Sequence, residues 1–317
     1  MFQGFGGKSS ATARAALTIN GQRAALVRVS DGTAARPVLE ARVFDVITGD
    51  SGEPDFTKSG VDIKALQNLP VSTVLPGGSY QLMLEELPNA PRDELKQALA
   101  WRIRDRIDTP LDEAIIELLD MPAQARGGQK PSAYAAVTSQ AVVESLVAQV
   151  KRAGLKPDAI DLPELCLRNI AVRLPQDSRG VAFLHFTDDC GLLTITRGGV
   201  LYLVRRIDVG QVALDETPGT QSREALIPKI CLELQRSLDY YETHYDCRPV
   251  SDLVLGPGSG IGALQEALRD QLGLDVTTLD LADLFDISEP LSEETQHECL
   301  LAIGAALRSE APVRKAA

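Results

Sequence analysis

Aromatic residues are scarce in this chain: they make up 4% of its 317 residues, and the only tryptophan is Trp101. A core must therefore be built from Leu, Val, Ile and Ala. Apolar residues still reach 44% and charged residues 24%, close to the globular averages of about 45–50% and 25%, which argues against disorder over most of the length. The length exceeds the roughly 100–200 residues of one domain and predicts two domains, or one domain with insertions.

A long apolar run is missing as well. No stretch approaches the roughly 18 consecutive apolar residues of a membrane-spanning helix, and the N-terminal residues MFQGFGGKSSATARA lack the apolar segment of an export signal. Basic residues are outnumbered by acidic ones, with 32 Lys and Arg against 44 Asp and Glu, which gives a net charge of −12. Because such a field repels phosphate backbones, we expect a cytoplasmic protein that neither inserts into the membrane nor binds nucleic acid.

Catalytic and metal-binding patterns are absent too. The cysteines are odd in number and form no C-x-x-C pair, which predicts reduced thiols rather than a disulfide framework or a zinc site. His185, His244 and His297 form no H-x-x-x-H or H-E-x-x-H pattern, and Ser259 lies in GPGSG rather than in a G-x-S-x-G nucleophile elbow. We therefore assign no catalytic residue and no metal ligand. The five cysteines are Cys166, Cys190, Cys231, Cys247 and Cys299.

The N-terminal half begins with a hairpin pattern. In AALTINGQRAALVRV, residues 15–29, two strand-like runs flank Asn20-Gly21, a dipeptide typical of tight hairpin turns. A third strand is indicated at 41–47. The ends of the chain, 1–13 and 311–317, lack periodicity, and we expect them to be mobile.

Residues 80–161 follow the order β-α-β-β-α-β, which is typical of a ferredoxin-like unit. Its first helix, within PRDELKQALAWRIRDRI, has apolar residues at a spacing of four from Leu95 to Ile107, one face of an amphipathic helix. Trp101 stands beside that line among arginines. Since Trp and Arg are enriched at interface hot spots, Trp101 either belongs to a partner surface or covers the unit's own core.

The second half opens at Gly180 with three strand patterns, VAFLHFT, GLLTIT and VLYLVRRI, which predict an antiparallel meander. A long helix at 221–246 follows, then a strand, a glycine-rich turn and further helices. Both halves place strands first and helices afterwards, which favours a duplicated α/β layout.

In this order the chain resembles the PilM family of type IV pilus assembly proteins, especially its MshI branch. It is more distantly similar to the cytoplasmic part of GspL, a type II secretion protein. The resemblance covers roughly residues 14–309, and the order and spacing of its segments carry it. These segments are ELPNAPRDELKQALAWRIRDRIDTPLDEAIIELLDMP, AVTSQAVVESLVAQVKRAGLKPDAIDLPELCLRNIA, GGVLYLVRRIDVG, ICLELQRSLDYYE, LVLGPGSGIGALQEAL and LLAIGAALR.

The resemblance implies an actin-like α/β fold, in which two RNase H-like lobes surround a nucleotide cleft. The first lobe is expected at 14–179, with the ferredoxin-like unit inserted at 78–158, and the second at 180–310. Family members look like cytoplasmic platforms that receive, in a groove beside the insertion, the N-terminal tail of a single-pass, PilN-like inner-membrane protein. The chain would then lie peripherally at the inner membrane within the pilus platform, as a monomer or a homo-oligomer.

The resemblance also marks positions for phosphate and metal. Members that bind ATP carry Asp-x-Gly in the first hairpin loop, where this chain has TIN at 18–20 followed by Gly21. In the second loop the expected Asp and Gly fall on His185 and Thr187. Asp188 and Asp189 lie just beyond, either as substitutes for the missing acid or as solvated turn residues.

A third loop, GPGSG at 256–260, follows a strand pattern and opens a helix pattern. This arrangement suits phosphate binding at a helix N-terminus, but it is equally typical of a tight turn that needs a positive φ. The candidate cofactor is ATP with Mg²⁺. The candidate cofactor-binding residues are Asn20, Gly21, Thr187, Asp188, Gly256, Gly258 and Ser259.

Together these patterns predict a degenerate pseudo-ATPase that acts as a scaffold in the biogenesis of a type IV, MSHA-type pilus. One alternative is an active ATPase or kinase of the same fold, which would need acids at positions 18 and 185. Another is a filament-forming cytoskeletal protein, which the sequence does not exclude.

Overall fold

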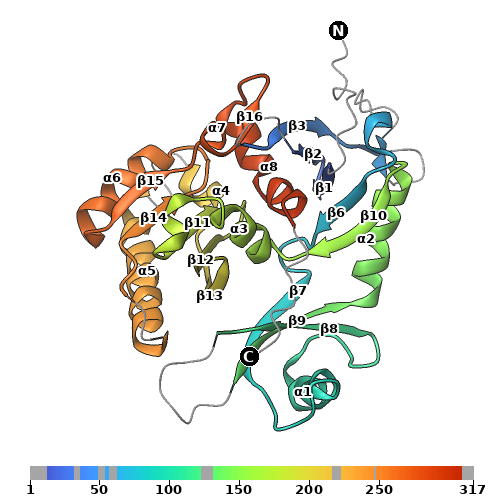
Figure 1. Cartoon of the computed structure of the whole chain (residues 1–317), viewed down its shortest axis with the longest axis horizontal. Helices are drawn as coiled ribbons and strands as arrows, with labels where there is room; N and C mark the ends of the chain where they lie inside the picture. The colour runs from blue at the N-terminus through green and yellow to red at the C-terminus, as the bar shows by residue number, and fades with distance from the viewer. Residues whose placement is uncertain are drawn as a thin grey trace.

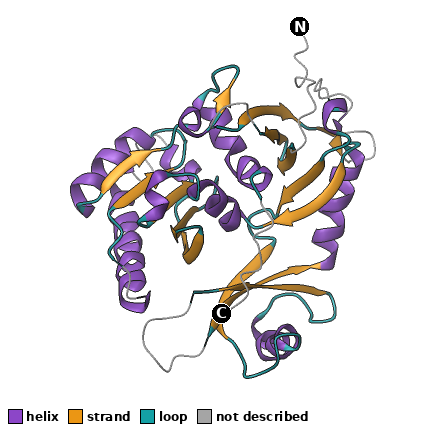
Figure 2. Ribbon diagram, viewed as in Figure 1, coloured by secondary structure: helices purple, strands orange, loops and turns teal. Residues whose placement is uncertain are grey.

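The computed structural model describes residues 13–31, 36–48, 54–56, 63–122, 131–215, 223–245 and 248–308. Figures 1 and 2 show two lobes, each a sheet with helices packed on it, and a smaller sheet with one helix that extends from the first lobe. The predicted mobile ends, 1–13 and 311–317, lie outside the described residues apart from Ala13.

The sheet of the first lobe is built on the predicted hairpin. β1 and β2 pair antiparallel around a turn in which Gly21 has a φ of +57°, a conformation that favours glycine. β3 continues the antiparallel pairing beyond β2, while β6 and β10 run parallel to β1 on its other side. The strands are β1 (Arg14–Asn20), β2 (Arg23–Ser30), β3 (Val38–Asp45), β6 (Pro70–Val74), β10 (Lys156–Asp161) and β16 (Asp286–Ile287), in the order β10-β6-β1-β2-β3-β16.

The sheet of the second lobe repeats this plan. β11, β12 and β13 form the predicted antiparallel meander, and β14 and β15 run parallel to β11 on its other side. The strands are β11 (Val181–Phe186), β12 (Gly191–Arg197), β13 (Val200–Ile207), β14 (Asp252–Leu255) and β15 (Asp275–Thr278), in the order β13-β12-β11-β14-β15. Apart from β16, the two sheets share one order and one set of directions, so the duplicated α/β layout is confirmed.

The helices and short elements complete both lobes. The α-helices are α1 (Leu95–Ile103), α2 (Gln140–Arg152), α3 (Pro163–Ala171), α4 (Gln211–Asp215), α5 (Arg223–Tyr245), α6 (Ile261–Leu272), α7 (Leu281–Leu284) and α8 (Glu293–Ala306). The short elements are β4 (Ile47–Thr48), β5 (Pro54–Asp55), and the 3₁₀ turns η2 (Lys64–Leu66), η3 (Arg104–Arg106) and η4 (Pro175–Ser178). Within the described ranges no helix is long and apolar enough to cross a membrane.

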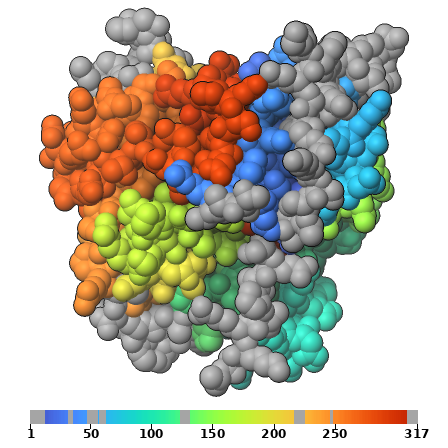
Figure 3. Space-filling model, turned by 45° about the horizontal axis from the view of Figure 1, so that its top comes forward, coloured from blue at the N-terminus to red at the C-terminus, as the bar shows by residue number. Residues whose placement is uncertain are grey.

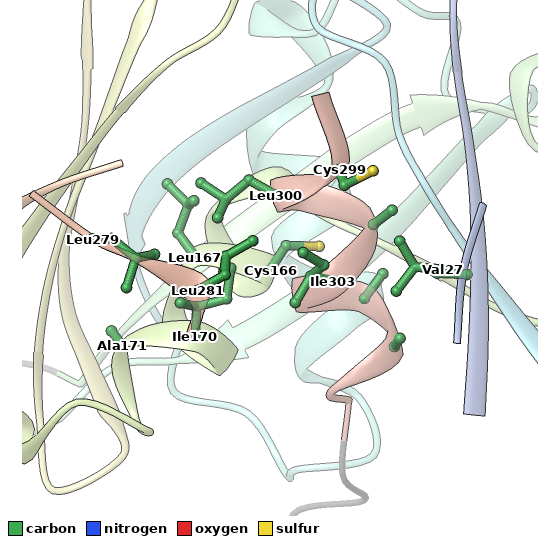
Figure 4. Close-up of a cluster of buried hydrophobic side chains, with 14 of the residues drawn as sticks. Val27, Cys166, Leu167, Ile170, Ala171, Leu279, Leu281, Cys299, Leu300 and Ile303 are labelled. Carbon is green, nitrogen blue, oxygen red and sulfur yellow. The ribbon is translucent and has the colours of Figure 1, made fainter. Parts of the chain in front are cut away.

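One helix from each half of the chain packs on the sheet of the other lobe. α8, which ends the second half, packs on β1, β2, β3 and β6, whereas α3, which ends the first half, packs on β11 and β12. The two helices also contact each other, and their apolar faces meet in the cluster drawn in Figure 4. Figure 3 shows the consequence: the C-terminal residues, in red, lie between the first lobe, in blue, and the rest of the second lobe, in orange. One continuous core therefore joins the lobes.

The small sheet belongs to the predicted insertion, which follows the order β-α-β-β-α-β. β7 (Tyr80–Glu86), β8 (Ala114–Asp120) and β9 (Ser132–Ser139) form its sheet, in the order β7-β9-β8, with α1 packed on β8. α2 packs on both β9 and β10, and β10, the last strand of that order, pairs in parallel with β6 and so returns the chain to the sheet of the first lobe. Element order does not say which sheet a strand joins, because a parallel partner is chosen by tertiary pairing.

The cysteines that the structure describes, Cys166, Cys190, Cys231 and Cys299, are all free and buried. They pack as small apolar side chains, in line with the predicted reduced thiols. Cys247 lies outside the described residues.

Candidate functional site

A cleft with a volume of about 740 Å³ opens between the lobes. Its floor is formed by two hairpin turns, β1–β2 from the first lobe and β11–β12 from the second. The β6–β7 connection, the start of α4 and the N-terminal half of α8 form the walls. A space of this size accommodates a nucleotide-sized ligand.

The two hairpin turns touch each other across the cleft floor. The Asn20 side-chain amide donates a hydrogen bond to Oδ2 of Asp188 over 2.7 Å. Asn20 is the last residue of β1, and Asp188 follows the end of β11, so this bond joins the first lobe to the second. It occupies the place where the sequence resemblance puts phosphate and metal.

Asp189, the next residue of the second turn, is also engaged. Its Oδ2 accepts a hydrogen bond from Nη2 of Arg206 at 3.2 Å, which closes an ion pair within the second lobe. On the other side its carboxylate faces Gly77, where a Cβ would approach both oxygens to 4.0 Å. Both acids that could replace the missing loop carboxylates therefore reach the cleft, and each already has a protein partner.

The glycine-rich turn at 256–260 owes its glycines to side-chain packing. A Cβ on Gly256 would lie 2.7 Å from Nδ1 of His185, and one on Gly258 would lie 2.6 Å from Oε1 of Gln211. Nδ1 of His297 lies 2.9 Å from the carbonyl oxygen of Pro257 and holds the turn from α8. These contacts explain why positions 256 and 258 are glycines, and the explanation needs no bound phosphate. Gly260 has its own reason, because its φ of +71° favours glycine at the start of α6.

Two histidines that are far apart in the sequence meet beneath this turn. The rings of His185 and His297 lie 5.0 Å apart, centroid to centroid. His185 is 2% exposed, and its Nδ1 has no hydrogen-bond partner. Burial, and secondarily the neighbouring His297, hold the pKa of His185 well below its usual value. His185 is therefore neutral and part of the core, and it does not take the role of a loop acid.

Acidic side chains dominate the cleft. Six carboxylates line it, from Asp188, Asp189, Asp215, Glu293, Glu294 and Glu298, against the guanidinium groups of Arg23 and Arg206. Arg23 is already tied to α8, with a 2.7 Å contact to Glu298 and a 3.4 Å contact to Glu294. A polyphosphate entering this cleft would meet uncompensated negative charge.

The residues present do not fit Mg²⁺ with the polyphosphate of ATP. Mg²⁺ at a nucleotide is held by one or two carboxylates together with phosphate oxygens and waters, but of the loop acids that could serve, Asp188 already faces the Asn20 amide nitrogen and Asp189 is held by Arg206. Across the part of the chain that the structure describes, no three His, Cys, Asp or Glu side chains are grouped to hold a metal ion. The cleft thus has room for a nucleotide but not the chemistry for its metal-bound end.

The seven candidate residues fall into three groups. Asn20, Thr187, Asp188 and Ser259 line the cleft. Gly21 forms the turn next to Asn20, where a Cβ would meet nothing within 4 Å. Gly256 and Gly258 lie behind the lining and pack on His185 and Gln211.

Sequence reasoning missed a polar connection from the cleft to the insertion. The Tyr80 hydroxyl, at the start of β7, bonds both carboxylate oxygens of Glu164 at 2.8 and 2.9 Å. Burial raises the pKa of Glu164, and the nearby Arg206 opposes that rise. Arg206 thus forms an ion pair with Asp189 at the cleft and also acts electrostatically on Glu164 of α3. The only available signal was the position of Arg206 near the end of a strand, which is too common a pattern to use.

The insertion presents Trp101 to solvent. Its side chain is 58% exposed on α1, and the Arg104 guanidinium lies 5.7 Å from the ring centroid. The neighbouring Arg102 bonds the carbonyl oxygen of Glu86 at 2.9 Å. The core of the insertion is built by Leu99 and Ile103 instead. Of the two interpretations of Trp101, the one that has it covering this core is therefore wrong.

Comparison with known proteins supports the fold. No protein-family model matches the chain, and no curated protein does. Among solved structures, the chain is similar to the PilM–PilN type IV pilus biogenesis complex, with a TM-score of 0.67 and 21% identity over 94% of this chain and 99% of that chain. The cytoplasmic domain of EpsL, an inner-membrane component of the type II secretion system of Vibrio cholerae, aligns with a TM-score of 0.48 and 11% identity over 94% and 96%.

At 21% identity the first likeness shows the fold, and the second is too weak to carry an argument. Over 94% of its length the chain has the fold of the pilus protein, with two lobes that repeat one strand order around a cleft. The resemblance found in the sequence and the actin-like fold it implied are confirmed.

Proposed function

We propose that this chain is a PilM-like scaffold of type IV, MSHA-type pilus biogenesis that binds the N-terminal cytoplasmic tail of a PilN-like inner-membrane protein. The observation that carries the proposal is the likeness to a PilM–PilN complex over 94% of this chain and 99% of that chain, since it spans both lobes and the insertion. Through this partner the chain would lie at the cytoplasmic face of the inner membrane and join the pilus platform.

The insertion is where we place the tail. Trp101 and its neighbours Arg102 and Arg104 are exposed on α1, away from the core of the insertion. A large aromatic ring stacked under a guanidinium offers apolar area and a cation together, a combination common at interface hot spots. Burying it against a peptide would remove apolar surface from water at little cost in side-chain entropy.

The cleft, in this proposal, performs no phosphoryl transfer. Transfer depends on metal and preorganised charge around the γ-phosphate, and the loop acids here face Asn20 and Arg206. Any nucleotide would act by favouring one arrangement of the lobes. The chain would therefore act as a pseudo-ATPase.

The test uses a synthetic peptide of the N-terminal cytoplasmic tail of a PilN-like protein from the same organism. Titration calorimetry should detect binding, and the fluorescence of Trp101, the only tryptophan, should shift to shorter wavelength as the ring is buried. Trp101→Ala should weaken binding by about tenfold or more, the range of a hot-spot residue.

A matched control is Leu232→Ala on α5, another large apolar side chain that is 45% exposed. This change should leave peptide affinity unaltered. If no heat and no fluorescence change appear with the tail peptide, the proposed partner is wrong. If the peptide binds equally well to the Trp101 variant, the tail lies elsewhere.

A further inference from the structure

We propose that the Asn20–Asp188 bond is a metal-free latch between the lobes, and that Asn20 decides which class of ligand the cleft can take. The bond is 2.7 Å long and joins residues that are 168 positions apart in the sequence. It stands at the meeting point of two hairpin turns on the cleft floor. An amide paired with a carboxylate satisfies both groups without a cation.

Asp188 is fixed in place by the backbone around it. Its carbonyl oxygen accepts a hydrogen bond from the Val212 amide at 3.1 Å, and the neighbouring Thr187 carbonyl accepts one from the Gln211 amide at 2.7 Å. A Cβ on Gly210 would overlap the Asp188 carbonyl oxygen, so the start of α4 lies directly against the turn. The turn therefore has little freedom to move away from whatever stands at position 20.

The charge balance of the floor depends on one atom of residue 20. Asp189 has Arg206 as its counterion, whereas Asp188 accepts its hydrogen bond from the neutral amide of Asn20. Replacing the amide nitrogen of Asn20 by oxygen would set two carboxylates at hydrogen-bond distance, where like charges repel unless a proton or a cation lies between them. With Asn20 no cation is required to join the two turns.

The ligand class follows from this charge balance. Because Asp188 is held by Asn20 and Asp189 by Arg206, the wild-type floor offers a divalent cation no free carboxylate pair, which favours ligands that bring no metal over a metal-bound polyphosphate. With the proposed function as a premise, the scaffold would hold its tail-binding conformation without nucleotide.

The experiment measures the thermal midpoint, Tm, of the full-length protein with and without MgCl₂. Wild type should show no shift with Mg²⁺. Asn20→Asp should lower Tm by about 2 °C or more in the absence of divalent cations, and Mg²⁺ should recover most of that loss. Asn20→Ala, which removes the bond without adding charge, should be less stable than wild type and indifferent to Mg²⁺.

The double variant Asn20→Asp with Asp188→Asn reverses the pair and serves as the decisive control. It restores one amide and one carboxylate, so its Tm should return toward wild type and its response to Mg²⁺ should disappear. The proposal is overturned if Asn20→Asp matches wild type in both conditions, or if the reversed pair keeps the Mg²⁺ response. The test needs no partner peptide, so its result is independent of tail binding.

Discussion

At the scale of single residues, the side chains on the cleft floor already have partners within the protein. Asn20 donates a hydrogen bond to Asp188, Arg206 forms an ion pair with Asp189, and His185 is buried as a neutral ring beneath the glycine-rich turn. Two acids near the expected phosphate positions are therefore engaged within the chain, although the cleft as a whole remains acidic.

His185 makes stability depend on pH. Its pKa in the folded chain lies well below the ordinary value of 6.5, because of burial and then His297. The unfolded chain therefore binds more protons than the folded one as pH falls below about 6.5, and stability is lost in that direction. We expect the Tm of wild type to fall more between pH 7.5 and pH 5.5 than that of His185→Gln.

Comparing wild type with His185→Gln over one pH range isolates the contribution of this histidine to the pH dependence of Tm. Burial raises the pKa values of Asp161 and Glu164, and a raised carboxyl pKa makes stability increase as pH falls. Both carboxyl groups are present in both proteins, so their contributions cancel in the comparison. Equal pH dependence in wild type and His185→Gln would mean that the pKa of His185 is the same in the folded and unfolded chains, as for an exposed side chain.

At the scale of elements, the crossing of α3 and α8 holds the lobes together. The helices approach so closely at Gly304 that a Cβ there would overlap the carbonyl oxygen of Cys166. The Asn169 side chain donates a hydrogen bond to the Gly304 carbonyl at 2.9 Å from the same face of α3. Gly304 is therefore required by packing, although glycine weakens a helix interior.

Gly304→Ala should reduce the free energy of unfolding by about 1–3 kcal/mol, the usual cost of overpacking. Urea denaturation followed by circular dichroism measures the change. The matched control is Gly262→Ala on α6, where a Cβ would meet nothing within 4 Å, and it should stabilise the chain by about 0.4–1 kcal/mol. Equal stability of Gly304→Ala and wild type would show that the helices cross less closely than described.

At the scale of the whole molecule, one core spans both lobes, and the cleft between them is acidic. The largest cluster of buried residues includes members from β1, β2 and β3, from α3 and α8, and from β11 and β12. The insertion joins this body through Tyr80 and Glu164 and also touches the second lobe, since the Tyr134 hydroxyl accepts a hydrogen bond from the Val204 amide at 3.1 Å. The two lobes are therefore packed on a shared core, and the insertion is attached to both of them.

The purified protein should release no phosphate from ATP and Mg²⁺ above the level of the Asp188→Ala and Asp189→Ala variants. The reason is that these acids are committed to Asn20 and Arg206, so the charge that phosphoryl transfer needs is not available. Turnover in wild type that disappears in either variant would show that the carboxylates hold a metal after all, and that the enzyme interpretation is right.

Local patterns in the sequence determined the elements of this protein. The Asn20-Gly21 hairpin, the meander after Gly180 and the amphipathic helices could be predicted, because turn conformation and apolar periodicity depend on neighbours along the chain. The repeated order of strands and helices indicated a duplicated α/β layout, and the resemblance to the PilM family implied that this layout is actin-like.

Only the tertiary structure decided which distant groups meet. It placed β10 beside β6, exposed Trp101, brought His185 to His297 and set Asn20 against Asp188. The two turns that form the latch belong to different lobes, which are packed together where α3 and α8 meet. Contacts of this kind depend on packing between segments that the sequence keeps far apart, so no local pattern could reveal them.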